Sequence, residues 1–134
     1  MPSLTNVIFA GFVKNEDLFN LFAASDLVVS PSISELESTP ISLLSALVAG
    51  TPVIGTSIGG TAEAIPNDGI RGTIISPKDS LALANAIMQM LKKDNRSKEK
   101  ITFVPRFWSD VSRDYLRIAQ STLGLPAYVE SEIR

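Results

Sequence analysis

The sequence predicts an α/β fold, a Rossmann-like doubly wound parallel sheet with helices on both faces. Short apolar runs alternate along the 134 residues with longer stretches of helical periodicity, which is the pattern of strands joined by helical crossovers. The apolar runs are continuous rather than alternating, as in strands that are covered on both faces. A chain of this length can bury roughly two-thirds of its unfolded surface. We therefore expect one α/β domain with a substantial core.

The first part of the chain predicts a strand, a helix and a second strand. The apolar run from Val7 to Ala10 predicts a buried strand that begins the fold almost at the first residue. Asn15 is a suitable N-cap for a helix that ends near Ala24. The apolar face expected of this helix consists of Leu18, Phe19, Leu21 and Phe22. Leu27 to Val29 then predicts a second buried strand.

The stretch from Ser30 to Gly60 is the unit around which the rest of the chain is organised. It opens with a polar, acidic loop that contains Glu35, Glu37, Ser38 and Thr39. Pro40 has the fixed φ that suits a first helical residue, and Thr39 is a natural N-cap beside it. We expect the helix to run from Pro40 to Ala49, with Gly50 beyond its end, where positive φ is favoured. Its expected apolar face is Leu43, Leu44, Leu47 and Val48.

The second half of the chain predicts two further strands and two long helices. The strands are Thr51 to Ile54 and Gly72 to Ile75, with a short helical turn over 61–65 between them. A helix from Ser80 to Lys93 is expected to face inward with Leu81, Leu83, Ala84, Ile87, Met88 and Leu91. A last helix, Trp108 to Leu123, is expected to bury an apolar stripe made of Val111, Tyr115, Leu116, Ile118 and Ala119.

These elements predict a domain over residues 1–123 and a tail over 124–134. The tail has no periodicity, so we expect it to be mobile. The charged stretch 94–100 is interpreted as a solvated connection rather than as a binding patch.

The composition excludes several classes of function. The net charge is -2 and the sequence pI is about 5.1, which gives no pull toward nucleic acid. The chain has no cysteine and no histidine, so thiol nucleophiles, the common zinc sites and serine-histidine pairs are excluded. We expect neither a metal nor another cofactor. The sequence contains no signal peptide and no apolar stretch of membrane-spanning length, and we therefore expect a cytoplasmic protein.

The expected strand ends predict a binding crevice. Because the carboxyl ends of parallel strands meet at one edge of the sheet, Gly11-Phe12, Pro31-Ser32 and Thr56-Ser57 should lie along that edge. A helix that starts at Pro40 directs its free N–H groups toward the acidic loop before it. This geometry holds anions such as phosphate groups.

A set of motifs in a fixed order identifies a family resemblance. The motifs are Val7 to Val13, Leu21 to Asp26, Pro31-Ser32, Glu37, Ala46 to Ile54, Gly59-Gly60 with Glu63, Asp68-Gly69, Gly72, Pro77-Lys78-Asp79, and Phe107-Trp108 leading to Tyr115-Leu116. Any one of them is a weak signal, but their order over about 115 residues is specific. On these motifs the chain resembles the C-terminal, donor-binding half of the group 1 retaining glycosyltransferases, which have the two-domain GT-B fold.

The resemblance implies roles for individual residues around a nucleoside diphosphate sugar. Glu37 matches the first glutamate of the family's paired-glutamate motif, which hydrogen-bonds the donor sugar. The backbone N–H groups expected to face the diphosphate belong to Thr39, Ile41 and Ser42. Gly11, Phe12 and Val13 would form the loop beside the nucleobase. The resemblance assigns no residue as catalytic.

Each of these assignments has a structural alternative. Glu37 can be an exposed acid that complements a helix dipole, and the same explanation is stronger for Glu63 in its own helical turn. The pair Gly59-Gly60 can simply make a tight turn.

The sequence departs from the family pattern in two ways. Ser45 stands where the second glutamate of the motif binds the ribose hydroxyls, and a serine is shorter and uncharged. The loss of such charge-assisted bonds costs about 1.5–3 kcal/mol. The match also begins at a later strand of the domain, without the acceptor-binding half and without the basic residues that neutralise the diphosphate.

Two functions follow from these observations. The first is a domain that binds a nucleoside diphosphate sugar for transfer of a hexose to an acceptor and that is inactive alone. The alternative is a non-catalytic binding or assembly module that pairs with a separate N-terminal GT-B half or with further copies of itself. A receiver-like domain lacks its acidic cluster here, and the GxxxxGK and GxGxxG patterns do not occur.

Overall fold

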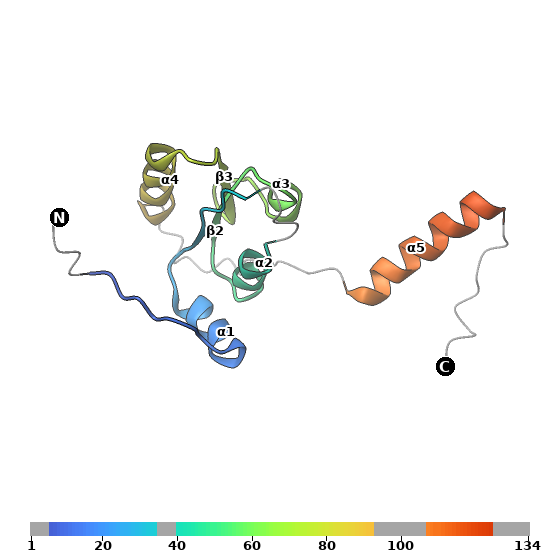
Figure 1. Cartoon of the computed structure of the whole chain (residues 1–134), viewed down its shortest axis with the longest axis horizontal. Coiled ribbons are helices and arrows are strands. Elements are labelled where there is room, and N and C mark those ends of the chain that lie inside the picture. Colours follow the sequence, from blue (N-terminus) through green and yellow to red (C-terminus); the bar gives the residue numbers. More distant parts are fainter. Residues whose placement is uncertain (1–5, 35–39, 93–106, 125–134) are drawn as a thin grey trace. The chain divides into compact units, whose positions relative to one another are not determined.

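The computed structural model describes residues 6–34, 40–92 and 107–124 and divides into two units, 1–103 and 104–134, which are described separately. The described part of the first unit contains a sheet and its helices, and that of the second contains one helix (Figure 1). The elements are α1 (Asn15–Ala24), β1 (Val28–Ser30), α2 (Ile41–Val48), β2 (Val53–Thr56), α3 (Thr61–Ala64), β3 (Gly72–Ile75), α4 (Ser80–Lys92) and α5 (Trp108–Leu123). Across the described residues, no helix is both long enough and apolar enough to cross a membrane.

The sheet is parallel and has three strands in the order β1-β2-β3. Val28 lies opposite Val53, and Ile54 lies opposite Thr73. All of β2 is buried, as expected for the central strand of a covered parallel sheet. The predicted α/β fold with a parallel sheet is confirmed.

The core consists of two hydrophobic clusters on opposite faces of this sheet. Val53 joins one cluster and its neighbour Ile54 joins the other, because successive side chains of a strand point to opposite faces. The Val53 cluster is completed by Phe22, Leu43, Ala46, Leu47 and Ile65, from α1, α2 and the end of α3. The Ile54 cluster is completed by Ile75, Ala86 and Met90, from β3 and α4. Helices therefore cover both faces, as the sequence predicts.

The helix α2 forms the centre of the Val53 cluster. It begins one residue later than predicted, because Pro40 has a non-helical ψ of 79° and is the N-cap rather than the first helical residue. Gly50 has a φ of +84°, which confirms the predicted helix end. Thr51 follows, and its buried hydroxyl donates to the carbonyl oxygen of Phe22 at 2.6 Å, which ties α1 to the start of β2.

The predicted strand from Val7 to Ala10 is wrong in this structure. The segment has no strand pairing, and Ile8 and Phe9 are 91% and 92% exposed. An apolar run becomes a strand only where a neighbouring strand supplies its backbone hydrogen bonds. The three-stranded sheet provides no such neighbour to this segment.

The inward faces predicted for three helices of the first unit differ in part from the structure. In α2, Leu43, Leu44 and Leu47 face inward as predicted, but Val48 is exposed and Ala46 is buried in its place. In α1 the N-cap is Lys14 rather than Asn15, and Phe22 is buried while Phe19 and Leu21 are exposed. In α4 the buried or half-buried residues are Ala82, Leu83, Ala86, Ile87 and Met90, whereas Leu81, Ala84, Met88 and Leu91 are exposed. The apolar residues of α4 surround much of the helix, so periodicity alone does not select the face that packs. Lys93 lies outside the described residues.

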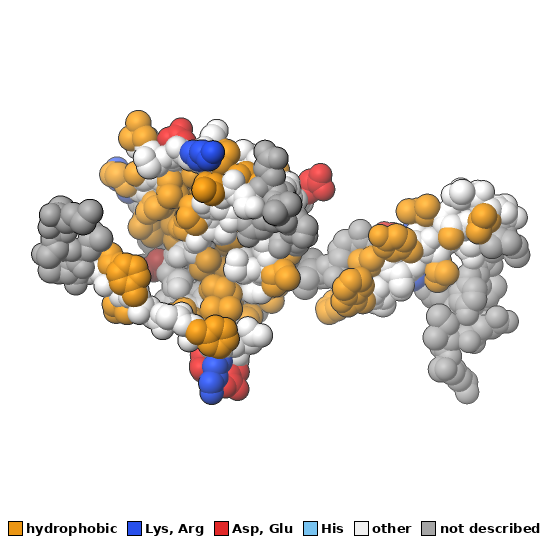
Figure 2. All heavy atoms as spheres, in the orientation of Figure 1, with side chains coloured by type: hydrophobic (Ala, Val, Ile, Leu, Met, Phe, Trp, Pro, Cys, Tyr) orange, Lys and Arg blue, Asp and Glu red, His pale blue; other side chains and the backbone are white. Residues whose placement is uncertain are grey.

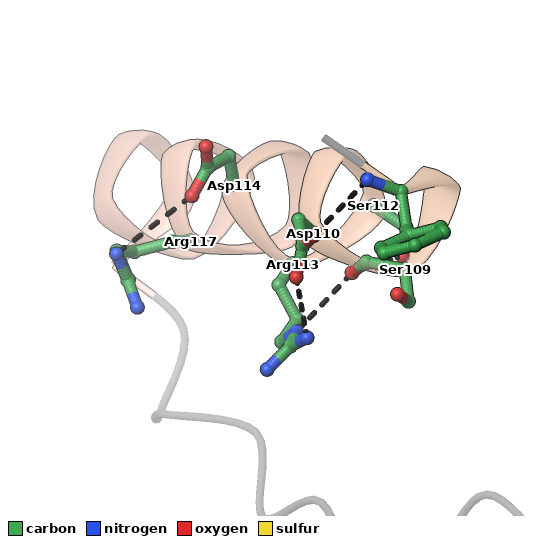
Figure 3. A network of polar contacts seen from close by, with 7 residues as sticks. Ser109, Asp110, Ser112, Arg113, Asp114 and Arg117 are labelled. Atoms are coloured by element: carbon green, nitrogen blue, oxygen red, sulfur yellow. Dashed lines mark hydrogen bonds and ion pairs between the residues drawn. The ribbon is translucent and has the colours of Figure 1, made fainter. Parts of the chain in front are cut away.

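The helix α5 has the predicted bounds, but its apolar stripe is not a core. None of its residues is buried, and Trp108 and Tyr115 are 87% and 71% exposed. Figure 2 shows hydrophobic side chains gathered along the helix of the second unit. Its polar side carries ion pairs from Arg113 to Asp110 at 2.7 Å and from Arg117 to Asp114 at 3.8 Å (Figure 3). The predicted connection 94–100 and the rest of the predicted tail, 125–134, lie outside the described residues.

Candidate functional site

Two adjacent hollows lie at the carboxyl ends of the strands. One has a volume of about 220 Å³ and is lined by residues at or just after the ends of all three strands, among them Pro31, Thr56 and Ser76. The other, about 440 Å³, is lined in part by Ser57 and Gly59 from the turn after β2. Ile33 and Lys78 line both hollows. We call this pair of hollows the carboxyl-edge crevice. Of the predicted edge it includes Pro31, Thr56 and Ser57 but neither Gly11 nor Phe12.

Thr56 connects two sides of the crevice. It is the last residue of β2 and only 3% exposed, yet it lines the smaller hollow. Its hydroxyl donates to the carbonyl oxygen of Ser32 at 2.7 Å. This bond holds the segment after β1, including Ile33, against the end of β2. It also fixes the point from which the chain enters the acidic loop.

The corner between β3 and α4 supplies the cationic side of the crevice. Lys78 has a left-handed backbone with a φ of +60°, which turns the chain sharply after Pro77. Asp79 then accepts the N–H of Ala82 at 2.8 Å through its side chain and so satisfies a donor in the first turn of α4. Because the Asp79 carboxylate is used in this way, Lys78 is the residue that can offer charge to a ligand at this corner.

The predicted diphosphate-binding residues are only partly described. Ile41 and Ser42 are exposed in the first turn of α2, where backbone N–H groups have no intrahelical acceptor. Ser45 is half-buried one turn later, on the same side of the helix as Ile41. Glu37 and Thr39 lie outside the described residues, as do Glu35 and Ser38. The roles of these residues stay predictions.

The predicted nucleobase loop forms no part of the walls of these hollows. Gly11 has a φ of +66°, Phe12 is 92% exposed and Val13 is half-buried. None of these three residues lines either hollow of the crevice. Their assignment to the nucleobase also stays a prediction.

Sequence reasoning missed the contributions of Thr56 and Lys78. Pro77-Lys78-Asp79 entered the sequence analysis only as one of the family motifs, although a charged residue between a strand end and a helix start is a signal for this edge. Thr56 marked a strand end, but its bond to Ser32 joins residues that are distant in sequence. No local pattern predicts such a bond.

The carboxylate of Asp68, at the amino end of β3 and away from the crevice, accepts several hydrogen bonds. The side chain of Asp68 accepts the backbone N–H groups of Ile70 and Arg71 at 2.9 and 2.7 Å, and the Arg71 guanidinium at 2.7 Å. Burial alone raises the pKa of Asp68, but the Arg71 guanidinium and the backbone donors outweigh it and hold the pKa well below its ordinary value. The arrangement shapes the turn before β3. Among the described residues, no group of three acidic side chains lies close enough to hold a metal ion.

A parallel sheet with a crevice at its carboxyl edge defines the class of Rossmann-like α/β ligand-binding domains. Within that class, the family of glycosyl transferases group 1 matches residues 3–103. The chain belongs to this family, which confirms the resemblance seen in the motifs.

Similar proteins in other organisms support the same assignment. The chain is 36% identical over 85 residues to the uncharacterized glycosyltransferase MJ1607 of Methanocaldococcus jannaschii, a match that covers 63% of this chain and 21% of that protein. It is 34% identical over 94 residues to the O-antigen chain mannosyltransferase C of Escherichia coli, covering 70% and 25%. The structure of a sucrose-phosphate synthase from Thermosynechococcus elongatus superimposes with a TM-score of 0.60 at 25% identity, covering 87% and 30%. The chain thus spans less than a third of the length of each of these relatives.

Proposed function

We propose that this chain binds a nucleoside diphosphate sugar at the carboxyl edge of its sheet, as the donor-binding part of a retaining hexosyltransferase. The observation that carries the proposal is a crevice at the strand ends in a chain that belongs to the group 1 glycosyl transferases. A hexose is the sugar class favoured, because one relative is named a mannosyltransferase.

The helix α2 provides the diphosphate contacts in this proposal. The N–H groups of Ile41 and Ser42 belong to the first turn of α2, where the helix dipole favours negative charge, and Thr39, outside the described residues, is proposed to add its N–H group. Pro40 has no N–H and offers none. Glu37, in the loop before the helix, hydrogen-bonds hydroxyl groups of the sugar.

The nucleoside contacts are weaker than the family pattern provides. Gly11, Phe12 and Val13 lie beside the nucleobase, and the exposed ring of Phe12 offers an apolar surface to it. Ser45 occupies the ribose position without a carboxylate. We therefore expect affinities for nucleoside diphosphates about ten- to a hundredfold below those of a site that has the second glutamate.

The reaction of the whole enzyme needs an acceptor-binding site, which the proposed donor site does not include. The bond between the anomeric carbon and the diphosphate breaks, and the acceptor oxygen bonds to the same face of the sugar. The acceptor proton passes to the departing phosphate. This chain positions the donor and stabilises the diphosphate through N–H groups. Because the acceptor site lies outside the matched half, the isolated chain is expected to show no transfer and no hydrolysis above background.

Calorimetric titration with uridine, guanosine and adenosine diphosphates tests the proposal. One of the three is expected to bind, and the corresponding nucleoside without phosphates should bind at least tenfold more weakly. Ser42→Asp places a negative charge among the phosphate-facing N–H groups and should weaken binding by about tenfold. Ser109→Asp is the matched control, an exposed serine in the first turn of α5, and should leave the affinity unchanged. Equal affinities for both variants would contradict the α2 site.

The second candidate function is a non-catalytic assembly module. It is favoured by Ser45 and by the exposed apolar residues Ile8, Phe9 and Phe12, which a partner could cover. Such a partner is a separate N-terminal GT-B half or another copy of the chain. If no diphosphate binds at millimolar concentration, this function becomes the better one.

A further inference from the structure

The larger hollow of the carboxyl-edge crevice has a cationic wall that the proposed diphosphate and sugar contacts do not use. Its volume is about 440 Å³, within the range of roughly 300–1,000 Å³ that is typical of small-molecule sites. It is lined by Lys78 and Ser57 together with Ile33, Ile58, Gly59 and Pro77. None of these described residues is acidic, whereas Asp79 lines the smaller hollow. A negatively charged group is therefore favoured in the larger hollow over the smaller one.

The ammonium group of Lys78 is free to contact a ligand. The side chain is exposed, and the structure gives it neither an ion pair nor a hydrogen bond within the described part of the chain. The neighbouring carboxylate of Asp79 accepts the N–H of Ala82 at 2.8 Å and so serves the start of α4. An uncompensated cation at the wall of a hollow attracts anions.

The backbone of Lys78 does not explain why a lysine occupies this position. Within residues 6–34, 40–92 and 107–124 it is the single residue other than glycine with a positive φ, at +60°. Glycine and asparagine adopt this conformation at lower cost, so the turn after Pro77 gains nothing from a lysine. Residues held in such a conformation gather at ligand sites, where the side chain has a use that offsets the backbone cost.

The turn after β2 places a second donor in the same hollow. The N–H of Ser57 donates to the carbonyl oxygen of Ile75 at 2.8 Å, which ties this turn to the end of β3. The N–H of Ile58 donates to the carbonyl oxygen of Thr56, also at 2.8 Å. The Ser57 hydroxyl makes no hydrogen bond among the described residues and is exposed. The hollow thus offers one ammonium and one hydroxyl donor from two turns that backbone hydrogen bonds hold together.

We propose that Lys78 and Ser57 bind a carboxylate or phosphate monoester group of a small-molecule ligand in the larger hollow. The lysine ammonium acts as a point charge for either group, and the serine hydroxyl donates to one of its oxygens. The subsite differs from the proposed diphosphate site, because it uses side chains after β2 and β3 instead of N–H groups of α2. The anion belongs either to an acidic donor sugar, a case that rests on the proposed function, or to a separate molecule.

Titration of the ¹⁵N-labelled chain with glucuronate, inorganic phosphate and glucose tests the subsite without a nucleotide. We expect saturable amide shifts at Ser57, Gly59 and Lys78 with at least one of the two anions, and none with neutral glucose. The absence of shifts from both anions at millimolar concentration, or shifts confined to Ile41 and Ser42, would overturn the proposal.

Variants of Lys78 separate its charge from its role in the turn. Lys78→Asn suits a positive φ, so it should leave the unfolding free energy unchanged or raise it, yet weaken anion binding at least tenfold. Lys78→Arg keeps the charge and should keep the affinity within a few fold. Lys92→Asn is the matched control, because Lys92 is an exposed lysine at the far end of α4, and it should leave the affinity unchanged. Equal anion affinities of Lys78→Asn and the natural chain would contradict the subsite.

Calorimetry with acidic and neutral donors identifies where the anion comes from. The pairs are uridine diphosphate glucuronic acid with uridine diphosphate glucose, and guanosine diphosphate mannuronic acid with guanosine diphosphate mannose. A preference for the acidic donor of at least tenfold that Lys78→Asn removes assigns the anion to the donor sugar. Equal affinities for both donors, with binding of free anions that depends on Lys78, assign it to a separate molecule. If anions bind and no nucleotide does, the proposed function fails while the subsite stands; nucleotide binding without any effect of Lys78→Asn on anions refutes the subsite alone.

Discussion

Gly55 provides the sharpest test of how α2 and α3 are positioned over the sheet. It lies within the buried strand β2. A Cβ at this position would lie 2.7 Å from Cγ2 of Thr61, 3.0 Å from Cδ1 of Leu43 and 3.1 Å from Cδ1 of Ile65. Gly55→Ala therefore forces three side chains of α2 and α3 to shift, and overpacking of this kind costs about 1–3 kcal/mol.

The expected cost is about 1–2 kcal/mol, because methyl groups rather than backbone atoms form these contacts and can shift in part. Where the added Cβ meets no neighbouring atom, a glycine-to-alanine substitution stabilises a protein by about 0.4–1 kcal/mol, because alanine lowers the conformational entropy of the unfolded chain. The sign of the change thus decides whether the helices pack this closely on β2. Guanidinium unfolding followed by far-ultraviolet circular dichroism measures it, since the single tryptophan, Trp108, belongs to the second unit.

Thr61→Ser provides the matched control, because it removes the methyl group that lies closest to the added Cβ. In the natural background it should destabilise the chain by about 1 kcal/mol through the lost buried methyl group. In the Gly55→Ala background the cost should be smaller by at least about 0.5 kcal/mol, because the clash is relieved. A stabilising Gly55→Ala, or strictly additive effects, would refute the packing described for α2 and α3.

Three further predictions concern the site and its scaffold. Ser45→Glu should tighten binding of a nucleoside diphosphate by about tenfold, equal to 1.4 kcal/mol, and the gain should vanish with a 2′,3′-dideoxy nucleotide in calorimetry. Thr56→Val should weaken nucleotide binding by several fold because the segment after β1 loses its anchor at Ser32, whereas Thr56→Ser should restore it; equal affinities of the two variants would count against this role. The pKa of Asp68 is lower in the folded state than its ordinary value, so the ionised carboxylate stabilises the fold. This stabilisation is complete above the ordinary aspartate pKa of about 4 and is lost as the pH falls below that value. Asp68→Asn should therefore cost about 0.5–1 kcal/mol at pH 7 after solvent screening, and chemical unfolding at pH 3 should show a smaller difference; a pH-independent difference would contradict the prediction.

The elements that local chemistry determines could be predicted from the sequence. Gly50 ends α2 because a positive φ is needed there, and Gly72 to Ile75 form a strand where the sequence expects one. The bounds of α5 are also those expected. For Gly50 and α5 the deciding interactions lie within a few residues along the chain, whereas β3 also needs its pairing with β2.

The elements that depend on distant partners were predicted less well. The segment Val7–Ala10 has strand composition, but a strand also needs a neighbour, and composition does not provide one. The face that α4 buries depends on which side meets β3, and its apolar residues allow more than one choice. The crevice edge was predictable from strand order, whereas the bond from Thr56 to Ser32 was not, because it joins separate strand ends.

The central claim is that a nucleoside diphosphate sugar binds at the carboxyl edge of the sheet, beside the N-terminus of α2. The most direct measurement is a titration of the ¹⁵N-labelled chain with uridine and guanosine diphosphate sugars, followed by amide chemical shifts. We expect saturable shifts at Ile41, Ser42 and Ser57, and none at Ile70 and Arg71 near the amino end of β3. The absence of shifts at millimolar ligand, or shifts confined to the turn at Ile70 and Arg71, would contradict the claim.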